Sequence, residues 1–218
     1  MSSGKLQTLI GYFKRYGLRK TALRVVTDSF RQTGIVRVSR FIVLYPDCVD
    51  CSAFTPELSY QRALLPATQL RPYQAQIPDQ LPEQLLGAAE KSGDYCLAIF
   101  DGDELVSFGW YATRTARLFD RTFCFGPQFV YMYHGFTRPD YRGQHLHALG
   151  LAEAMTAFQQ QGKSAIVSTV NITNYRARIS CERLGFRNSG FITQIGRGRS
   201  GLLFVTPKVR TYGVRFSR

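Results

Sequence analysis

The sequence predicts an α/β fold in which helices flank a mixed, mostly antiparallel central sheet. Three observations support this prediction. Strand-like and helix-like segments alternate from residue 68 to residue 206, an Asp-Gly turn joins two apolar runs, and an apolar helix follows residues 129–137 after a short turn. Such alternation is typical of domains whose helices bury one apolar stripe against the face of a sheet.

The first half of the pattern predicts a strand, a helix and three antiparallel strands. We expect a strand over residues 68–74 and a helix within residues 78–93, where Leu85, Leu86 and Ala89 are apolar. The apolar residues 95–100 and 104–112 flank Asp-Gly-Asp, which predicts a hairpin with a tight turn. Residues 129–137 predict the next strand.

The second half predicts two helices, a buried strand and a closing hairpin. Residues 148–161 form an apolar helix, residues 164–170 a buried strand, and residues 174–184 a helix that Gly185 ends. Residues 191–195 and 202–206 predict a hairpin around residues 196–201. That turn matches the letters GxGxxG, but a dinucleotide site needs a helix afterwards, and here a strand-like Leu-Leu-Phe-Val follows.

The N-terminal residues 1–60 predict a basic helical and strand extension, and residues 61–218 predict the main domain. Apolar residues recur at helical spacing within residues 3–31, with a break at Gly17 and Lys and Arg interleaved. A helix that covers its own domain is favoured over a basic amphipathic face on a membrane. Residues 40–46 predict a short strand that Pro46 ends.

The net charge of +13 is concentrated at the two ends of the chain. Residues 1–40 carry nine Lys or Arg and one Asp, and residues 196–218 carry six Lys or Arg and no acidic residue. The middle of the chain is close to neutral. Basic ends favour an acidic carrier protein or an anionic membrane surface as partner, with nucleic acid less expected, or they serve solubility alone.

A strand, an Arg-Gly turn and a helix start predict a phosphate-binding place at residues 138–147, which read RPDYRGQHLH. The first N–H groups of a helix have no partner inside the helix, and the helix dipole favours negative charge there. A second segment contains Asn174 and Ala177 and ends in Leu184, Gly185 and Phe186.

These two segments resemble the GNAT superfamily of N-acetyltransferases, whose pyrophosphate loop reads Arg/Gln-x-x-Gly-x-Gly/Ala. The resemblance covers roughly residues 68–204, and His145 and His147 stand where the family has small residues. It implies a GNAT-like fold and an acyl-CoA donor, most simply acetyl-CoA, with no metal. The residues that it implies for cofactor binding are Phe136, Thr137, Arg138, Arg142, Gly143, Gln144, His145, Leu146, His147 and Asn174.

The resemblance also points to two candidate catalytic residues. His134 lies near the end of the central strand, where family members hold the acyl-pantetheine, and an imidazole suits the acceptance of a proton from an amine. A packed histidine is the other interpretation. Cys181 stands where many members have a Tyr that protonates the leaving thiolate; it is either a proton donor or a small buried residue.

Three aromatic residues on adjacent predicted strands are candidates for binding the acceptor. Tyr131 and Tyr133 share one face of their strand because side chains alternate, and Trp110 lies on the strand before. A role in the core is the alternative. The histidines at 134, 145 and 147 cluster in sequence, but no ligand set for a metal is evident near them.

Two functions remain open at this point. The chain is an N-acyltransferase that moves an acyl group from acyl-CoA, or from an acyl carrier protein, to a primary amine of a small molecule. Alternatively, it is a non-catalytic GNAT-like module that binds CoA or a polyanion. Five cysteines without a secretion signal predict free thiols and a cytoplasmic protein, peripheral at the membrane if the basic ends bind lipid.

Overall fold

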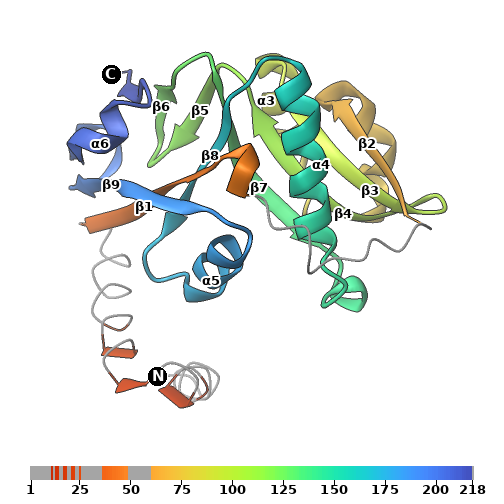
Figure 1. Ribbon diagram of the computed structural model, residues 1–218, viewed down its shortest axis with the longest axis horizontal. Coiled ribbons are helices and arrows are strands. Elements are labelled where there is room, and N and C mark those ends of the chain that lie inside the picture. The colour runs from red at the N-terminus through yellow and green to blue at the C-terminus, as the bar shows by residue number, and fades with distance from the viewer. Residues whose placement is uncertain are drawn as a thin grey trace.

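A computed structural model of the chain shows a large mixed sheet with helices on both faces (Figure 1). The structure describes residues 36–48 and 60–217, together with isolated positions between 11 and 25. Apart from these isolated positions, the expected helices within residues 3–31 therefore lie outside the described residues. Eight strands form the sheet in the order β10-β9-β1-β8-β7-β4-β3-β2. Of the neighbouring pairs, β7 and β8 run parallel and the others run antiparallel, as the predicted mixed, mostly antiparallel sheet requires.

Strand β1 (Val36–Leu44) corrects the expected place of the N-terminal strand. The strand exists and ends before Pro46, as predicted, but it does not lie in an extension outside the main domain. It pairs with β8 (Ala165–Asn171) on one side and with β9 (Arg187–Ile195) on the other. Phe41, Val43 and Leu44 are fully buried, so the central sheet includes this segment.

The predicted hairpin is confirmed, but the strand that precedes it lies earlier in the chain than predicted. Strands β3 (Tyr95–Asp101) and β4 (Glu104–Ala112) are joined at Gly102, whose φ of 56° suits a tight turn. Residues 68–74 are not a strand but part of the 3-10 helix η2 (Ala67–Gln76); the edge strand is β2 (Gln61–Pro66). Pro72 has no N–H to donate to a ladder, which disfavours a strand there.

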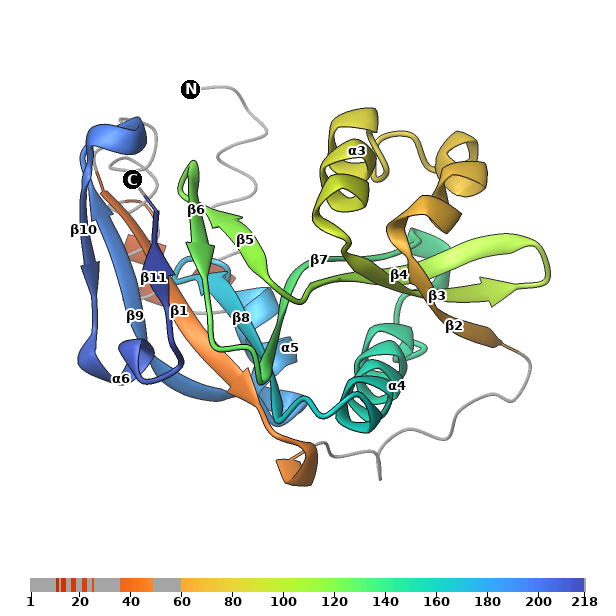
Figure 2. The same ribbon diagram turned by 90° about the horizontal axis from the view of Figure 1, so that it is seen from above.

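Helices cover the two faces of the sheet in separate layers (Figure 2). Helix α4 (Leu146–Gln160) packs on β2, β3, β4 and β7 from one face, and α3 (Glu83–Ser92) with η2 covers the opposite face. Helix α5 (Tyr175–Arg183) lies on the same face as α4, because both contribute to one apolar cluster. Gly185 ends α5 with a φ of 90° at a point where a Cβ atom would overlap the carbonyl of Cys48.

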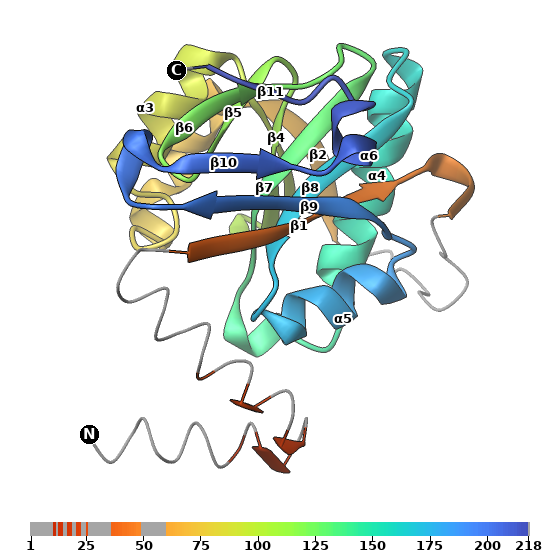
Figure 3. The same cartoon turned by 90° about the vertical axis from the view of Figure 1, so that its left-hand side faces the viewer.

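A second, three-stranded sheet covers the rest of the face opposite α5. It comprises β5 (Thr115–Leu118), β6 (Arg121–Cys124) and β11 (Arg215–Phe216), in the order β11-β6-β5. The short helix α6 (Pro207–Arg210) packs beside it on β9 (Figure 3). The sequence did not predict these elements. The predicted closing hairpin is confirmed as β9 and β10 (Leu202–Val205).

Candidate active site

The two parallel strands of the sheet diverge halfway along their length. Strand β7 (Phe129–Thr137) pairs with β8 from Phe129 opposite Ala165 to Met132 opposite Ser168, and the pairing ends there. The Ser168 hydroxyl donates to the carbonyl of Met132 at 2.8 Å and closes the paired part. Beyond this point β7 keeps only β4 as a neighbour among the described strands. One edge of β7 over residues 133–137 is therefore open.

The phase of the β4–β7 ladder decides which backbone groups face this opening. The Arg138 N–H donates to the Val106 carbonyl, so these two residues form a hydrogen-bonded pair. Such pairs recur at every second residue of the register, which makes Phe136 and His134 the next β7 residues that are hydrogen-bonded to β4. Hydrogen-bonded residues alternate in an antiparallel pair, so the polar groups of Gly135 and Thr137 point away from β4. This supports the expected amide of Thr137, but it replaces Phe136 with Gly135, since the N–H of Phe136 faces β4.

His147 occupies the space beside Gly135. Its imidazole Cε1 lies 2.9 Å, and its Nδ1 3.3 Å, from the position that a Cβ atom on Gly135 would have. The ring therefore rests against the backbone of β7 at the opening, on the face that α4 covers. Burial lowers the pKa of His147, so the ring is neutral at pH 7.

His134 lies on the opposite face of the sheet. Side chains alternate along a strand, so His134 and the missing side chain of Gly135 point to opposite faces. The ring of His134 packs 5.7 Å from that of Phe108, in the cluster under η2 and α3. Its Nε2 is buried and has no hydrogen-bond partner among the described residues, and burial lowers its pKa. Two imidazoles thus flank Gly135, one on each face.

The loop between β7 and α4 leaves several backbone donors open. The N–H groups of Gly143, Gln144, Leu146 and His147 make no hydrogen bond within the described part of the chain. His145 adopts a left-handed conformation with a φ of 60° at the N-terminus of α4. Donors gathered at the start of a 15-residue helix favour an anion. This is the geometry expected of a phosphate site.

The two arginines near this loop have different surroundings. Arg142 is exposed, and its Nε donates to the carbonyl of Thr137 at 3.3 Å. Arg138, also expected to bind the cofactor, instead binds Glu104 at 2.5 Å and donates to the carbonyl of Leu105 at 3.0 Å. Those contacts hold the guanidinium of Arg138 against the start of β4, which leaves it less free than Arg142 to bind a phosphate.

Neighbouring side chains fix the path of this loop. The hydroxyl of Tyr141 donates to Asp101 at 2.9 Å and to Glu104 at 3.2 Å, which ties the loop to the β3–β4 hairpin. Gln144, an expected cofactor contact, accepts a hydrogen bond from the hydroxyl of Tyr60 at 2.5 Å. Leu146, another expected contact, is buried in the core beneath α4, so that its backbone alone can face a ligand.

Asn174 caps the start of α5 and Cys181 lies within it, and the two residues have different surroundings. Asn174 is the N-cap, and its side chain accepts from the N–H of Ala177 at 3.1 Å. Cys181 is half-buried and lines a hollow beneath α5 together with Arg40. Burial, and then the charge of Glu182, raise the pKa of Cys181 to about 11. That makes Cys181 a weaker acid than an ordinary thiol, whose pKa is about 8.5.

The three candidate acceptor-binding aromatics form one stack on the face of His134. Tyr133 lies 6.4 Å from Trp110 and 6.4 Å from Tyr131, with rings near parallel. Trp110 and Tyr131 are almost fully buried, which indicates a core role, whereas Tyr133 is only partly buried. Of the three, Tyr133 therefore has the exposed surface that a ligand could meet.

Asp94, which no feature of the sequence singled out, lies next to this stack. Asp94 is buried, and its carboxylate accepts a hydrogen bond from the Tyr133 hydroxyl at 2.9 Å. Burial raises the pKa of Asp94 to about 6, against the lowering by Tyr133. The available sequence signal was that Asp94 directly follows Gly93, which ends α3 with a φ of 69°. That signal marks the end of a helix but does not indicate that the Asp94 side chain is buried.

Two further features concern metal ions and membranes. The described residues contain no group of three or more His, Cys, Asp or Glu side chains that could hold a metal ion. Within the same residues, no helix has the length and apolar character needed to cross a bilayer.

Comparison with known proteins agrees with this geometry. The model of the acetyltransferase (GNAT) family matches residues 62–186. A tandem GNAT protein from the clavulanic acid biosynthesis pathway superposes with a TM-score of 0.52 at 12% identity, over 75% of this chain and 56% of its own. A putative GNAT acetyltransferase from Novosphingobium aromaticivorans gives 0.50 at 17% identity, over 72% and 62%.

A conserved protein of unknown function from Staphylococcus epidermidis also superposes, with a TM-score of 0.51 at 10% identity, over 78% of this chain and 65% of its own. This chain thus spans 56–65% of the length of these three solved structures. At such identities the likeness establishes the fold. No curated protein matches the chain.

Proposed function

The chain belongs to the acetyltransferase (GNAT) family, and from this premise we propose that it is an N-acyltransferase. It moves an acyl group, most simply acetyl, from acyl-CoA to a primary amine by direct attack. The observation that carries the proposal is the divergence of β7 from β8 directly before the loop that begins α4. One place in the chain thus offers open strand amides for a thioester and open helix amides for phosphates.

The donor is proposed to bind on the face that α4 covers. The CoA pyrophosphate accepts from the N–H groups around Gly143 and Leu146, and Arg142 leaves the Thr137 carbonyl to bind a phosphate. The pantetheine then follows the open edge of β7. There the N–H groups of Gly135 and Thr137 are placed to polarise the thioester carbonyl, where charge develops during attack.

The acceptor amine is proposed to approach from the other face, where His134 lies. The amine loses a proton to the imidazole of His134, directly or through a water, and its nitrogen attacks the thioester carbon. Its lowered pKa keeps His134 neutral at pH 7, as a base requires. The C–N bond forms, the C–S bond breaks, and CoA leaves as a thiolate that takes up one proton.

The leaving sulfur is proposed to meet His147 rather than Cys181. His147 rests against Gly135 on the donor face, and a neutral imidazole has one N–H that can donate a hydrogen bond to the departing thiolate. The thiolate takes its proton from solvent, because a neutral imidazole does not release its remaining proton. A Cys181 thiol with a pKa of about 11 would protonate a thiolate of ordinary pKa only uphill. Cys181 is therefore left out of the proposed mechanism.

A small primary amine is the proposed acceptor class. Tyr133, which is only partly buried, gives the acceptor face an aromatic surface, and Asp94 behind it adds a carboxyl group. A thioester on an acyl carrier protein would present the same pantetheine arm, and the basic ends of the chain would suit such a protein.

Calorimetric titration with acetyl-CoA tests the proposal, followed by an assay for thiol release with a panel of primary amines. We expect saturable binding, and thiol release that depends on both acetyl-CoA and an amine. Binding of acetyl-CoA without thiol release for any amine would indicate a CoA-binding module without catalytic activity. Failure to bind acetyl-CoA, longer acyl-CoA or an acylated carrier protein would contradict the proposed function.

A further inference from the structure

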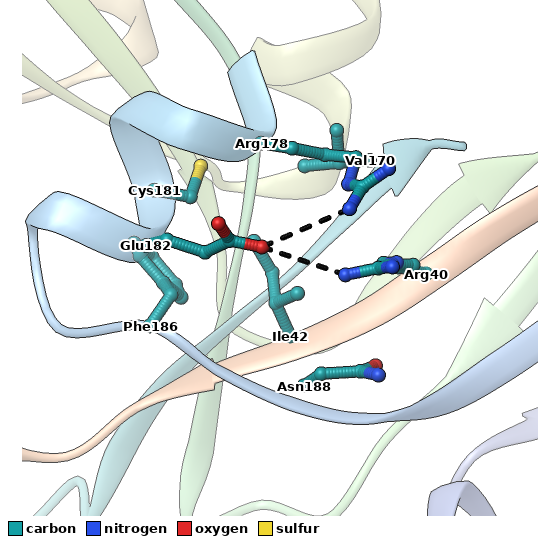
Figure 4. A pocket seen from close by; sticks show the side chains of 8 residues that line it. All are labelled: Arg40, Ile42, Val170, Arg178, Cys181, Glu182, Phe186 and Asn188. Atoms are coloured by element: carbon teal, nitrogen blue, oxygen red, sulfur yellow. Dashed lines mark hydrogen bonds and ion pairs between the residues drawn. The ribbon is translucent and has the colours of Figure 1, made fainter. Parts of the chain in front are cut away.

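A small hollow opens beneath α5, over β1 and β8 (Figure 4). Its floor is apolar and comes from three strands or their ends, with Ile42 on β1, Val170 on β8 and Phe186 just before β9. Its polar side chains are Arg40 on β1, Arg178 and Glu182 on α5, and Asn188 on β9, and the thiol of Cys181 on α5 also lines it. None of these residues belongs to the proposed acyltransferase site.

Two guanidinium groups in this hollow share one carboxylate. Figure 4 shows the side chains of Arg40 and Arg178 converging on Glu182. The same oxygen of Glu182 lies 3.5 Å from Nη1 of Arg40 and 3.9 Å from Nη2 of Arg178. Charge-assisted hydrogen bonds are normally 2.7–2.9 Å long, so this carboxylate is held loosely.

The arginines of the hollow also keep unused donors. The Nε atoms of both Arg40 and Arg178 are buried without a hydrogen-bond partner among the described residues. Arg37, on the same strand, has an unpaired Nε too, but its guanidinium binds Asp120 at a normal 3.0 Å. Buried donors without a protein partner are rare in folded proteins, and those that occur often bind a water molecule or an ion.

The charges in the hollow do not balance. Two positive groups face one negative group, and Glu182 is 57% exposed while the arginines are 24% and 17% exposed. Burial, and next the charge of Arg178, lower the pKa of Arg40, which Glu182 offsets in part. The half-buried positive pair is thus only partly neutralised, and a second anion would be attracted to it.

We propose that this hollow binds a small carboxylate, which takes the place of the Glu182 side chain between Arg40 and Arg178. The class of ligand follows from Glu182, because the carboxylate that the protein itself supplies indicates the group that this pair of guanidinium forks accepts. The apolar floor of Ile42, Val170 and Phe186 favours a carboxylate with a short hydrocarbon part over an inorganic anion. Glu182 itself can turn outward, because it is the most exposed of the three charged groups. This binding site goes beyond the proposed acyl transfer and does not depend on it.

Titration of the full-length protein with sodium acetate tests this site, followed through the Nε–H signals of its arginines in nitrogen-15 NMR spectra. Sodium chloride and sodium phosphate at the same ionic strength are the reference titrations. We expect saturable shifts of the Arg40 and Arg178 signals with acetate and none for Arg37, which serves as the matched arginine on the same strand.

Two variants sharpen the test. Glu182→Gln removes the competing charge and should tighten acetate binding severalfold. Arg40→Gln removes a charged donor and should weaken it by about tenfold or more. Because Glu182→Gln retains size and polarity, it keeps the test decisive even where an arginine variant does not fold.

Three results would overturn the proposal. The first is the absence of saturable acetate shifts in both the wild-type protein and Glu182→Gln, which would make the three charges a structural cluster alone. The second is an equal response to chloride. The third is a response to phosphate without one to acetate, which would contradict the carboxylate class.

Discussion

The two flanks of strand β8 behave differently, and the difference marks the proposed active site. On one flank, β1 pairs with β8 continuously, from Ser39 opposite Asn171 to Leu44 opposite Ile166. On the other, the pairing with β7 stops at Met132 and Ser168, although both strands continue. Backbone groups on the first flank are paired within the ladder, whereas the N–H groups of Gly135 and Thr137 remain available.

This comparison shows how a sheet can be stable and still offer a binding edge. Unpaired buried N–H and C=O groups cost free energy unless water or a ligand satisfies them. Here the open edge lies beside the start of α4, where further N–H groups are open. The continuous flank thus supplies rigidity, and the divergent flank supplies donors for a ligand.

The largest expected effect concerns His134, which the account places on the acceptor side of the divergence. His134→Ala should lower kcat by about 10²–10⁴-fold, the range for loss of a general base, with acetyl-CoA affinity near that of the wild type. Since burial lowers its pKa, the acid limb of the rate profile should lie below about 6.5, the ordinary value for histidine. Steady-state kinetics across pH measure both.

His147→Ala is the matched variant on the donor side. Because His147 contacts the donor edge at Gly135, its loss should change the affinity for acetyl-CoA, which loss of His134 should not. Equal effects of the two variants on acetyl-CoA affinity would contradict the separate roles of His147 at the donor and His134 at the acceptor. An unaltered pH profile in His134→Ala would exclude His134 as the base.

Next in size is Gly135→Ala, which narrows the divergent flank itself. The added Cβ would lie 2.9 Å from the ring of His147, so the ring must move into the space proposed for the thioester. We expect kcat/KM to fall by about 10²-fold, the cost of displacing reacting groups by about 1 Å. The double variant Gly135→Ala with His147→Ala removes the clash and should recover part of the loss; no recovery would mean that the two residues do not compete for this space.

Asp94→Asn tests the carboxyl group behind the acceptor face. The pKa of Asp94 is raised to about 6 in the folded protein, above its unfolded value of about 3.9. The folded state therefore holds the proton more tightly, and stability falls as pH rises from about 4 through 6. Asn keeps an acceptor for Tyr133 and should stabilise the protein by about 2–3 kcal/mol at pH 8 and much less at pH 4.

Denaturant unfolding at the two pH values measures this difference. Ser107→Ala, a change of another buried polar residue, provides a control whose effect should not depend on pH in this window. Equal stabilisation by Asp94→Asn at pH 4 and pH 8 would show that burial does not raise the pKa of the Asp94 carboxyl group.

The smallest expected effect is that of Arg142→Ala at the phosphate loop. Loss of one charged hydrogen bond should weaken acetyl-CoA binding by about 1–3 kcal/mol. Arg114→Ala, which removes another exposed arginine, is the matched control and should leave the affinity unchanged. Calorimetry with both variants checks this, and an affinity that survives in Arg142→Ala would exclude this arginine from phosphate binding.

Local signals in the sequence predicted the elements around the site well. The Asp-Gly turn between β3 and β4, the strand–turn–helix of β7 and α4, and the glycine that ends α5 all depend on neighbouring residues. The place of β1 does not, because its partners lie more than a hundred residues later in the chain. Strands adjacent in sequence are usually neighbours in a sheet, and β1 follows the less common arrangement.

The hairpin of β5 and β6 was missed for a different reason. Its turn places Phe119 and Asp120 at φ values of 55° and 63°. Turns of this kind normally contain Asn-Gly or Asp-Gly, so a Phe at the first position hides the signal.

Within the site, the sequence identified the segments but not the orientation of their side chains. It singled out the end of β7, the loop at Arg142 and both His134 and His147. Whether Gly135 or Phe136 offers its amide depends on the phase of the β4–β7 ladder, which is a property of pairing and not of composition. The burial of Asp94 likewise depends on Tyr133, far from it in sequence.

The most direct test of the account is a nitrogen-15 NMR titration of backbone amides with acetyl-CoA, which compares the two flanks of β8. We predict saturable shifts for the amides of Gly135 and Thr137 on the divergent flank, together with those of Gly143 and Leu146. The amides of Phe41 and Val43, on the continuous flank, should not shift. Acetyl-CoA binding that leaves Gly135 and Thr137 unmoved would contradict the claim that the open edge of β7 holds the acyl donor.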